Sequence, residues 1–311
     1  VIVKTGTYTE DVTIGKTLNL ASLPGGVIDL TGSVIANQPI GISGSLRSTD
    51  SQTYNNTLTL TGDTSLQTGA APASLTLGQV TGRDHDLTLT FNNAAASPVN
   101  ISQITGVRNF VTAGKGITTV GETFITTGFQ TYGAPLVLSS GTTLKSTGDI
   151  TVDSPISKTA GGDANLTLNA SNNIFVNAAI NSTAGKLNVA LNPTGGTTTL
   201  NSTISTNGGS LTGTASTVNV NSGARIQNGV DVAASGATIN VAEGSYTEDV
   251  IINKNLNLAS PKGKLIDLIA NNSGISGSLV ANNPIGISGS LRSTGSQTYN
   301  DTVTLNGNTS L

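Results

Sequence analysis

The run GDITVDSPISKTAGGDANLTLNASNNIFVNAAINSTAGKLNVALNP, residues Gly148–Pro193, repeats a short pattern of alternating side chains. Four isoleucines in and just beyond it are spaced 24, 24 and 22 residues apart: Ile156, Ile180, Ile204 and Ile226. Small-residue turns separate the alternating runs, at Gly161-Gly162, Ala184-Gly185 and Gly208-Gly209. Alternation with a period of two indicates strands, and Gly and Asn indicate turns. The run therefore predicts two or three short strands in each period.

Such a period is typical of a β-solenoid, in which each coil stacks on the next. With coils of about 22–24 residues, the chain would form roughly 13 coils and a rod on the order of 60 Å long. We predict an all-β parallel β-helix, with Ile156, Ile180 and Ile204 as vertical neighbours. Asn181 and Asn201 are expected to form stacked amide ladders. A parallel sheet with crossover helices lacks its helical pattern here, and an up-and-down sandwich would not require the fixed spacing.

Composition excludes several classes of protein. The 311 residues include no Cys and a single histidine, His85, which rules out disulfide-stapled modules, thiolate sites and His-rich metal centres. The net charge of −3 offers no basic surface, so nucleic acid is not expected as a partner. No apolar run approaches 18 residues, and we predict no transmembrane segment. Many β-branched residues and few charges favour ordered β structure over disorder.

Long repeats divide the chain. Residues Val1–Ser22 return as Ile239–Ser260 at an offset of 238, and Asn37–Leu66 return as Asn282–Leu311 at an offset of 245. We predict one long solenoid unit over 1–238 and the start of the next unit over 239–311, both in one rod. Because Val1 follows no signal segment and Leu311 lies inside the pattern, a longer tandem polypeptide is expected. A single duplication within one domain is the alternative.

A shorter cassette, Gln-Thr-Tyr, occurs three times. In each copy, leucines lie six and twelve residues after the tyrosine, which is Tyr54, Tyr132 or Tyr299. This identical spacing predicts the same structural position for all three tyrosines. They could stack on sugar rings, but packing residues that close a turn or cover a coil edge are the simpler interpretation.

These segments resemble known families. The Gly148–Pro193 run and the QTY cassette resemble the repeats of filamentous haemagglutinin-type bacterial surface proteins. GTYTEDVTIGKTLNLAS at Gly6–Ser22, with its copy at Gly244–Ser260, is similar to the opening coils of pectin-lyase-like β-helices. The resemblance implies a right-handed parallel β-helix, export across the bacterial outer membrane, and adhesion or an extended surface fibre. The secretion domain typical of that family is not among these residues.

Pectin-lyase-like folds can carry sugar-cleaving carboxylates, which must be clustered. Here the acids are few and scattered: Glu10, Asp11, Asp29, Asp84, Asp86, Asp149 and Asp153. Glu10-Asp11 recurs as Glu248-Asp249, and a repeated pair favours a structural role such as a turn cap. We predict no catalytic residue, and the chain is not expected to be an enzyme.

Three further patterns suggest binding sites. Arg83-Asp84-His85-Asp86 could hold a base or a metal ligand, but a solvated loop between strands ending at Val80 and starting at Leu87 is favoured. Threonines at Thr57–Thr61 and Leu87–Thr90 could form a hydroxyl array for ice or polysaccharide, although outward strand positions suit Thr in any case. Asn165-Leu-Thr167 is a glycosylation triplet expected by chance. No GGxGxD repeat occurs, so no calcium, metal or cofactor is predicted, and no ligand-binding residue is identified.

The sequence thus predicts a structural segment of a long extracellular bacterial surface fibre or adhesin stalk, associated with the outer membrane. Its expected partners are copies of itself, end to end or side by side, because coil ends are unpaired strand edges. Cell-surface or matrix glycans are the other expected partners. A glycan-binding module on the same rod is the first alternative, and a polysaccharide lyase or hydrolase is the second.

Overall fold

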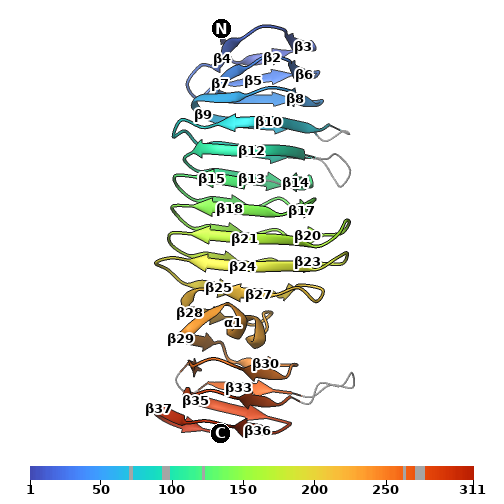
Figure 1. Ribbon diagram of the computed structural model, residues 1–311. Coiled ribbons are helices and arrows are strands. Elements are labelled where there is room, and N and C mark those ends of the chain that lie inside the picture. The colour runs from blue at the N-terminus through green and yellow to red at the C-terminus, as the bar shows by residue number, and fades with distance from the viewer. Residues whose placement is uncertain (70–72, 93–98, 121–122, 262–263, 270–276) are drawn as a thin grey trace.

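Short parallel strands stacked in coils make up nearly all of the regular structure (Figure 1). The stack has about 13 turns, and the two chain ends lie at opposite ends of it. Inward and outward residues alternate along each strand, as in β22 (Ile174–Val176), where the first and third side chains are buried. The predicted all-β parallel solenoid is confirmed. The computed structural model describes residues 1–69, 73–92, 99–120, 123–261, 264–269 and 277–311.

Up to β28, each coil contributes strands to three faces, A, B and C, which the chain visits in that order. Face A consists of β3 (Val12–Ile14), β6 (Val34–Ala36), β8 (Gln52–Tyr54), β14 (Thr118–Val120), β17 (Leu136–Leu138), β20 (Ile156–Lys158), β23 (Ile180–Ser182) and β26 (Ile204–Ser205). Face B consists of β4 (Leu18–Ser22), β15 (Thr123–Thr126), β18 (Thr142–Ser146), β21 (Ala164–Ala170), β24 (Leu187–Pro193) and β27 (Leu211–Gly213), and β1 (Ile2–Val3) pairs with β4.

Face C consists of β2 (Gly6–Tyr8), β5 (Val27–Leu30), β11 (Leu87–Phe91), β13 (Phe110–Gly114), β16 (Gln130–Tyr132), β19 (Ile150–Val152), β22, β25 (Thr198–Leu200) and β28 (Ala215–Val220). Four long strands bend from one face to the next: β7 (Ile40–Ser48), β9 (Leu58–Thr68), β10 (Leu75–Thr81) and β12 (Val99–Val107). After α1 (Ile226–Val232) come β29 (Ala233–Val241), β30 (Gly244–Tyr246), β31 (Val250–Ile252), β32 (Leu256–Ala259), β33 (Leu265–Leu268), β34 (Leu279–Ala281), β35 (Ile285–Ser293), β36 (Gln297–Tyr299) and β37 (Val303–Ser310).

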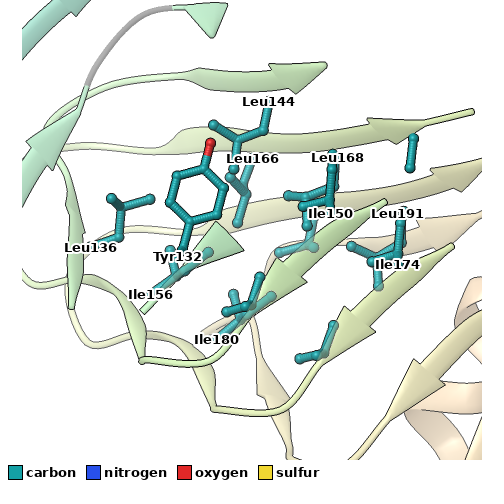
Figure 2. Close-up of a cluster of buried hydrophobic side chains, with 14 of the residues drawn as sticks. Tyr132, Leu136, Leu144, Ile150, Ile156, Leu166, Leu168, Ile174, Ile180 and Leu191 are labelled. Carbon is teal, nitrogen blue, oxygen red and sulfur yellow. The ribbon is translucent and has the colours of Figure 1, made fainter. Parts of the chain in front are cut away.

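The core is a narrow apolar column enclosed by the three faces. Ile156 pairs with Ile180, and Ile180 pairs with Ile204, so the predicted vertical neighbours are confirmed. Figure 2 shows Ile156 and Ile180 on successive coils, among leucines and isoleucines from the other faces. The few aromatic rings gather near one level, where Phe110 packs edge-on against Phe124 and Tyr132.

Coil length varies more than the sequence suggested. Bonded equivalents such as Asn37 and Asn55 lie 18 residues apart, whereas Asp249 and Ser278 lie 29 apart. The prediction of 22–24 residues holds for the Gly148–Pro193 run from which it was drawn. It is wrong for the whole chain, because turns can shorten or lengthen without disturbing the stacked strands.

Helix α1 replaces a strand on face A below β26. The Ile226 prediction was therefore wrong, since this residue begins the helix and does not extend the isoleucine column. The Asn228 side chain takes over part of the missing pairing, because its Oδ1 accepts the Ile204 N–H at 3.0 Å. The helix was missed because its seven residues are too short to show a sustained helical period.

Repeated cassettes do not all occupy the same face. Tyr54 lies on face A, between Ala36 and Leu77, whereas Tyr132 lies on face C, between Thr112 and Val152. The prediction of one shared position for the three tyrosines is wrong at this level. The spacing between cassettes need not equal a whole number of coils, so an identical segment can return rotated by one face.

The long repeat behaves in the same way. Leu20 stacks above Ile42 on face B. Its equivalent, Leu258, instead continues the face C column through Val218 and Ile239. The second copy is therefore displaced by one face around the rod axis.

Candidate functional site

The cassette tyrosines are internal packing residues. Tyr54 and Tyr132 are fully buried, and each hydroxyl donates to the glutamine two residues earlier, at 2.9 and 2.8 Å. Burial raises the pKa of both hydroxyls. Tyr299 is half-buried and makes the same bond to Gln297 at 2.6 Å. The packing interpretation is confirmed, and the buried Tyr54 and Tyr132 rings cannot stack on a sugar.

The partner glutamines were missed by the sequence analysis. Gln130 is fully buried, and its Nε2 donates to the Lys145 carbonyl of the next coil at 2.8 Å. Gln52 makes the equivalent bond to the Gln67 carbonyl at 2.8 Å. A buried amide so placed ties adjacent coils together inside the rod, whichever face the cassette occupies.

We expect Tyr132→Phe to lower the free energy of unfolding by about 1–2 kcal/mol, because Gln130 would lose the donor to its buried Oε1. Urea denaturation of the full chain would measure the change. Tyr299→Phe is the matched control in the last coil, where water can replace the hydroxyl, and its effect should be smaller. Equal losses at the two positions would contradict this assignment.

The lysine of β20 is a second buried polar residue that the sequence did not reveal. Lys158 is 1% exposed, and its Nζ donates to the carbonyls of Ala160 at 2.7 Å and Ala184 at 2.8 Å. Ala184 belongs to the following turn. The ammonium group therefore fastens two successive turns from the inside.

The scattered acids mostly cap the next coil. Asp11 Oδ1 accepts the Ser33 N–H at 2.7 Å, and Asp249 Oδ1 accepts the Ser278 N–H at 2.9 Å. Asp149 Oδ1 accepts the N–H of Asn173 at 2.9 Å in the same manner. The Ser33 hydrogen bonds lower the pKa of Asp11. The predicted capping role of the repeated acid pair is confirmed for its aspartate.

The Arg83–Asp86 segment lies in the predicted loop, between β10 and β11, and faces an arginine of the next coil. Arg108 Nε donates to Asp86 Oδ1 at 2.8 Å, and Arg108 Nη2 lies 3.2 Å from Asp63 Oδ1. His85 Nδ1 is 3.7 Å from the same Asp63 oxygen. This exposed network joins three coils through one arginine, which accounts for the acids as structural partners.

Acid should weaken this network. Hydrogen bonds from Arg108 and from the Asn109 backbone lower the pKa of Asp86. A carboxyl with a lowered folded-state pKa stabilises the fold above its unfolded pKa of about 3.9, and this stabilisation disappears as pH falls through the lowered value. We expect Asp86→Asn to show a shallower loss of thermal stability between about pH 5 and pH 2 than the unmodified chain. Parallel curves would contradict the prediction.

Amide ladders run along the outside of the rod. Asn201 Nδ2 donates to Asn177 Oδ1 and Asn221 Nδ2 donates to Asn201 Oδ1, both at 2.6 Å, which confirms the prediction for Asn201. The prediction for Asn181 is wrong, because within the described residues its buried Oδ1 accepts no hydrogen bond. Asn165 also stands in a ladder, accepting from Asn188 at 2.9 Å.

The threonine runs do not form a long hydroxyl array. Thr88 faces outward, but its neighbours on adjacent coils are Ser65 and Val111. Thr59 lies between Gly41 and Thr81. Their outward positions follow from the strand alternation alone.

A polar groove of about 380 Å³ lies beside α1, where the sequence gave no indication of a site. Its lining includes Arg225, Gln227 and Asp231. Burial raises the pKa of Asp231, although Gln227 donates to its carboxylate at 2.8 Å. Burial also raises the pKa of Glu248, whose side chain is only 2% exposed next to the groove. The helix thus brings together the most strongly desolvated carboxyls that the structure describes.

Within the described residues, no group of three His, Asp or Glu side chains is placed to hold a metal ion. The same part of the chain contains no helix long and apolar enough to cross a membrane.

These features define the class of the protein as a β-solenoid scaffold whose polar side chains largely connect one coil to the next. Comparison finds no matching protein family, no significantly similar curated protein and no significantly similar solved structure.

Proposed function

We propose that this chain is a non-catalytic structural segment of a long extracellular fibre or adhesin stalk on a bacterial surface, built from tandem solenoid units. The observation that carries the proposal is the recurrence of one set of contacts in two repeat copies within one rod. Arg47 pairs with Asp29 in the first copy, and Arg292 pairs with Asp267 in the second, each by two hydrogen bonds. A unit that reproduces its own packing can lengthen a rod without new folding information.

The chemistry of the surface supports a load-bearing role. Only 10% of residues are charged, and the Asn and Asp side chains described above bond along the rod axis. Such short bonds between neighbouring coils depend little on ionic strength, because few of them join opposite charges. The resemblance to filamentous haemagglutinin-type repeats supports an extracellular location at the outer membrane and partners that are copies of the same protein or surface glycans.

Electron microscopy tests the proposal. The full chain should appear as rods on the order of 60 Å long, from about 13 coils at about 4.8 Å each. A chain with a second copy of residues 1–238 placed ahead of Val1 should be longer by about 50 Å at the same width. Compact globules, or an unchanged length, would refute the tandem-rod proposal.

Glycan binding on the same rod is the second candidate, and the groove beside α1 favours it. Arg225 and Asp231 supply a cation and a carboxylate in a concave site, and Asn228 adds an amide. A glycan array probed with the full chain should show binding that Asp231→Ala removes and Asp153→Ala, on the open coil surface, preserves. Array binding that both variants retain would place any glycan site elsewhere.

A further inference from the structure

The first coil presents an apolar surface at one end of the rod. A cavity of about 340 Å³ opens there, lined by residues that include Val1, Val3, Val12, Leu18 and Leu20. Val1 and Ile2 are 71% and 73% exposed. In a solenoid these inward-facing positions normally stack against another coil, so this end has the composition of an interior surface.

The second repeat copy shows what covers the same surface. Val250, the equivalent of Val12, is 1% exposed, and Leu256, the equivalent of Leu18, is 3% exposed. The covering coil contains β28 and α1. β29 pairs with β28, and α1 contacts β31. The structure therefore contains one occupied example of a surface whose first copy is open.

Specific polar contacts hold this covering coil. Glu248 accepts the N–H groups of Ile226 at 2.6 Å and Gln227 at 3.1 Å, which are free donors in the first turn of α1. At the other end of the helix, Lys254 Nζ donates to the carbonyls of Asp231 at 3.2 Å and Ala233 at 2.8 Å. One acid and one lysine thus satisfy backbone groups at both ends of the helix.

The side chain of Gln227 adds a strand-like contact between them. Its Oε1 accepts the Ile251 N–H at 2.8 Å, and its Nε2 donates to the Ile251 carbonyl at 3.2 Å. This pair of bonds replaces the ladder that a strand would make in the place of α1. The helix-bearing coil is therefore fitted to this surface by backbone as well as side-chain contacts.

The first copy retains the same acid and lysine, as Glu10 and Lys16, at the offset of 238. Both are exposed, and within the described part of the chain neither makes a hydrogen bond or ion pair. They lie at the rim of the open cavity. A capping acid and a capping lysine at matched positions, with the apolar surface between them, form the complement of α1.

We propose that the Val1–Leu20 surface docks the helix-bearing coil, residues 205–238, of a second copy of the long unit placed directly ahead of Val1. The sequence permits this junction without insertion, because Thr238 precedes Ile239, the equivalent of Val1. The inference rests on the proposed tandem arrangement and identifies the partner at each unit boundary. Helix α1 is then the joint between units, with Glu10 and Lys16 as its two anchors.

Hydrogen exchange measured by mass spectrometry tests the proposal on two chains. One is the full 311-residue chain, and the other carries residues 1–238 fused ahead of Val1 of that chain. At the junction, the amides equivalent to Val12–Ile14 should exchange at least about tenfold more slowly in the fused chain, and about as slowly as those of Val250–Ile252. Equal exchange in the two chains would overturn the proposal.

Two variants separate specific docking from general shielding. Glu10→Ala and Lys16→Ala, made at the junction of the fused chain, should restore much of the rapid exchange. The same substitutions in the 311-residue chain should leave its exchange and unfolding unchanged, because neither side chain has a partner there. Full protection at the junction despite both substitutions would overturn the assigned anchors.

Mixing the 311-residue chain with a second free copy distinguishes the source of the occupant. Helix α1 lies inside the rod of a free copy, so mixing should give no protection at Val12–Ile14. Protection on mixing would show that this surface binds the exposed rod end of another copy, and would overturn the proposed occupant. Rods of the greater length with a rapidly exchanging junction would refute the docking alone and leave the proposed function intact.

Discussion

We expect Ile180→Ala to lower the free energy of unfolding by about 2–5 kcal/mol, the range for truncating a buried isoleucine. Ile180 is fully buried and lies between Ile156 and Ile204 in the face A column. The cavity would therefore remove contacts with both adjacent coils. Urea denaturation, followed by circular dichroism, would measure the change in the full chain.

Ile125→Ala is the matched control. Ile125 lies on β15 but faces outward, with 36% of its surface exposed. The same truncation there should cost less than about 1 kcal/mol, since little contact is lost. Similar losses at Ile180 and Ile125 would contradict the stacked-column core.

The second large effect is expected at the turn glycines. Gly185 has a φ of +68°, and a Cβ added to it would lie 2.5 Å from the Gly162 carbonyl oxygen of the preceding coil. The left-handed conformation costs an alanine about 1–2 kcal/mol. The clash with backbone adds about 1–3 kcal/mol, because one coil must shift relative to the next. We expect both terms to appear in thermal and urea unfolding of Gly185→Ala.

Gly161→Ala provides the comparison for this prediction. Gly161 occupies the equivalent turn one coil earlier with a φ of +77°, but its added Cβ would meet only the Lys158 Nζ, at 4.0 Å. The substitution should therefore show the conformational strain without the clash. If Gly161→Ala were as destabilising as Gly185→Ala, close approach of the two coils would not be the cause.

The sequence was informative where a single coil explains the pattern. Alternation and the 24-residue spacing of Ile156 and Ile180 predicted the strands, the turns and the stacked column, because these depend on neighbouring coils alone. The capping role of Asp11 and the ladder through Asn201 followed for the same reason. A local repeat in the sequence becomes a local contact in a solenoid.

Prediction failed where position around the rod mattered. Tyr54 and Tyr132 share a cassette and its hydrogen bonds but lie on different faces, because the intervening coils differ in length. Ile226 keeps the spacing of the column, yet it begins a helix. The groove beside α1 and the buried Lys158 depend on which turns meet, which a linear pattern does not record.

The amino-acid sequence by itself determined that this chain winds into stacked parallel coils, since a period-two pattern repeated every two dozen residues can bury its apolar side in no simpler way. Only the tertiary structure decided which face each segment occupies and which side chains meet across coils. The physical reason is that turn lengths add along the chain, so small local differences accumulate into a rotation about the rod axis.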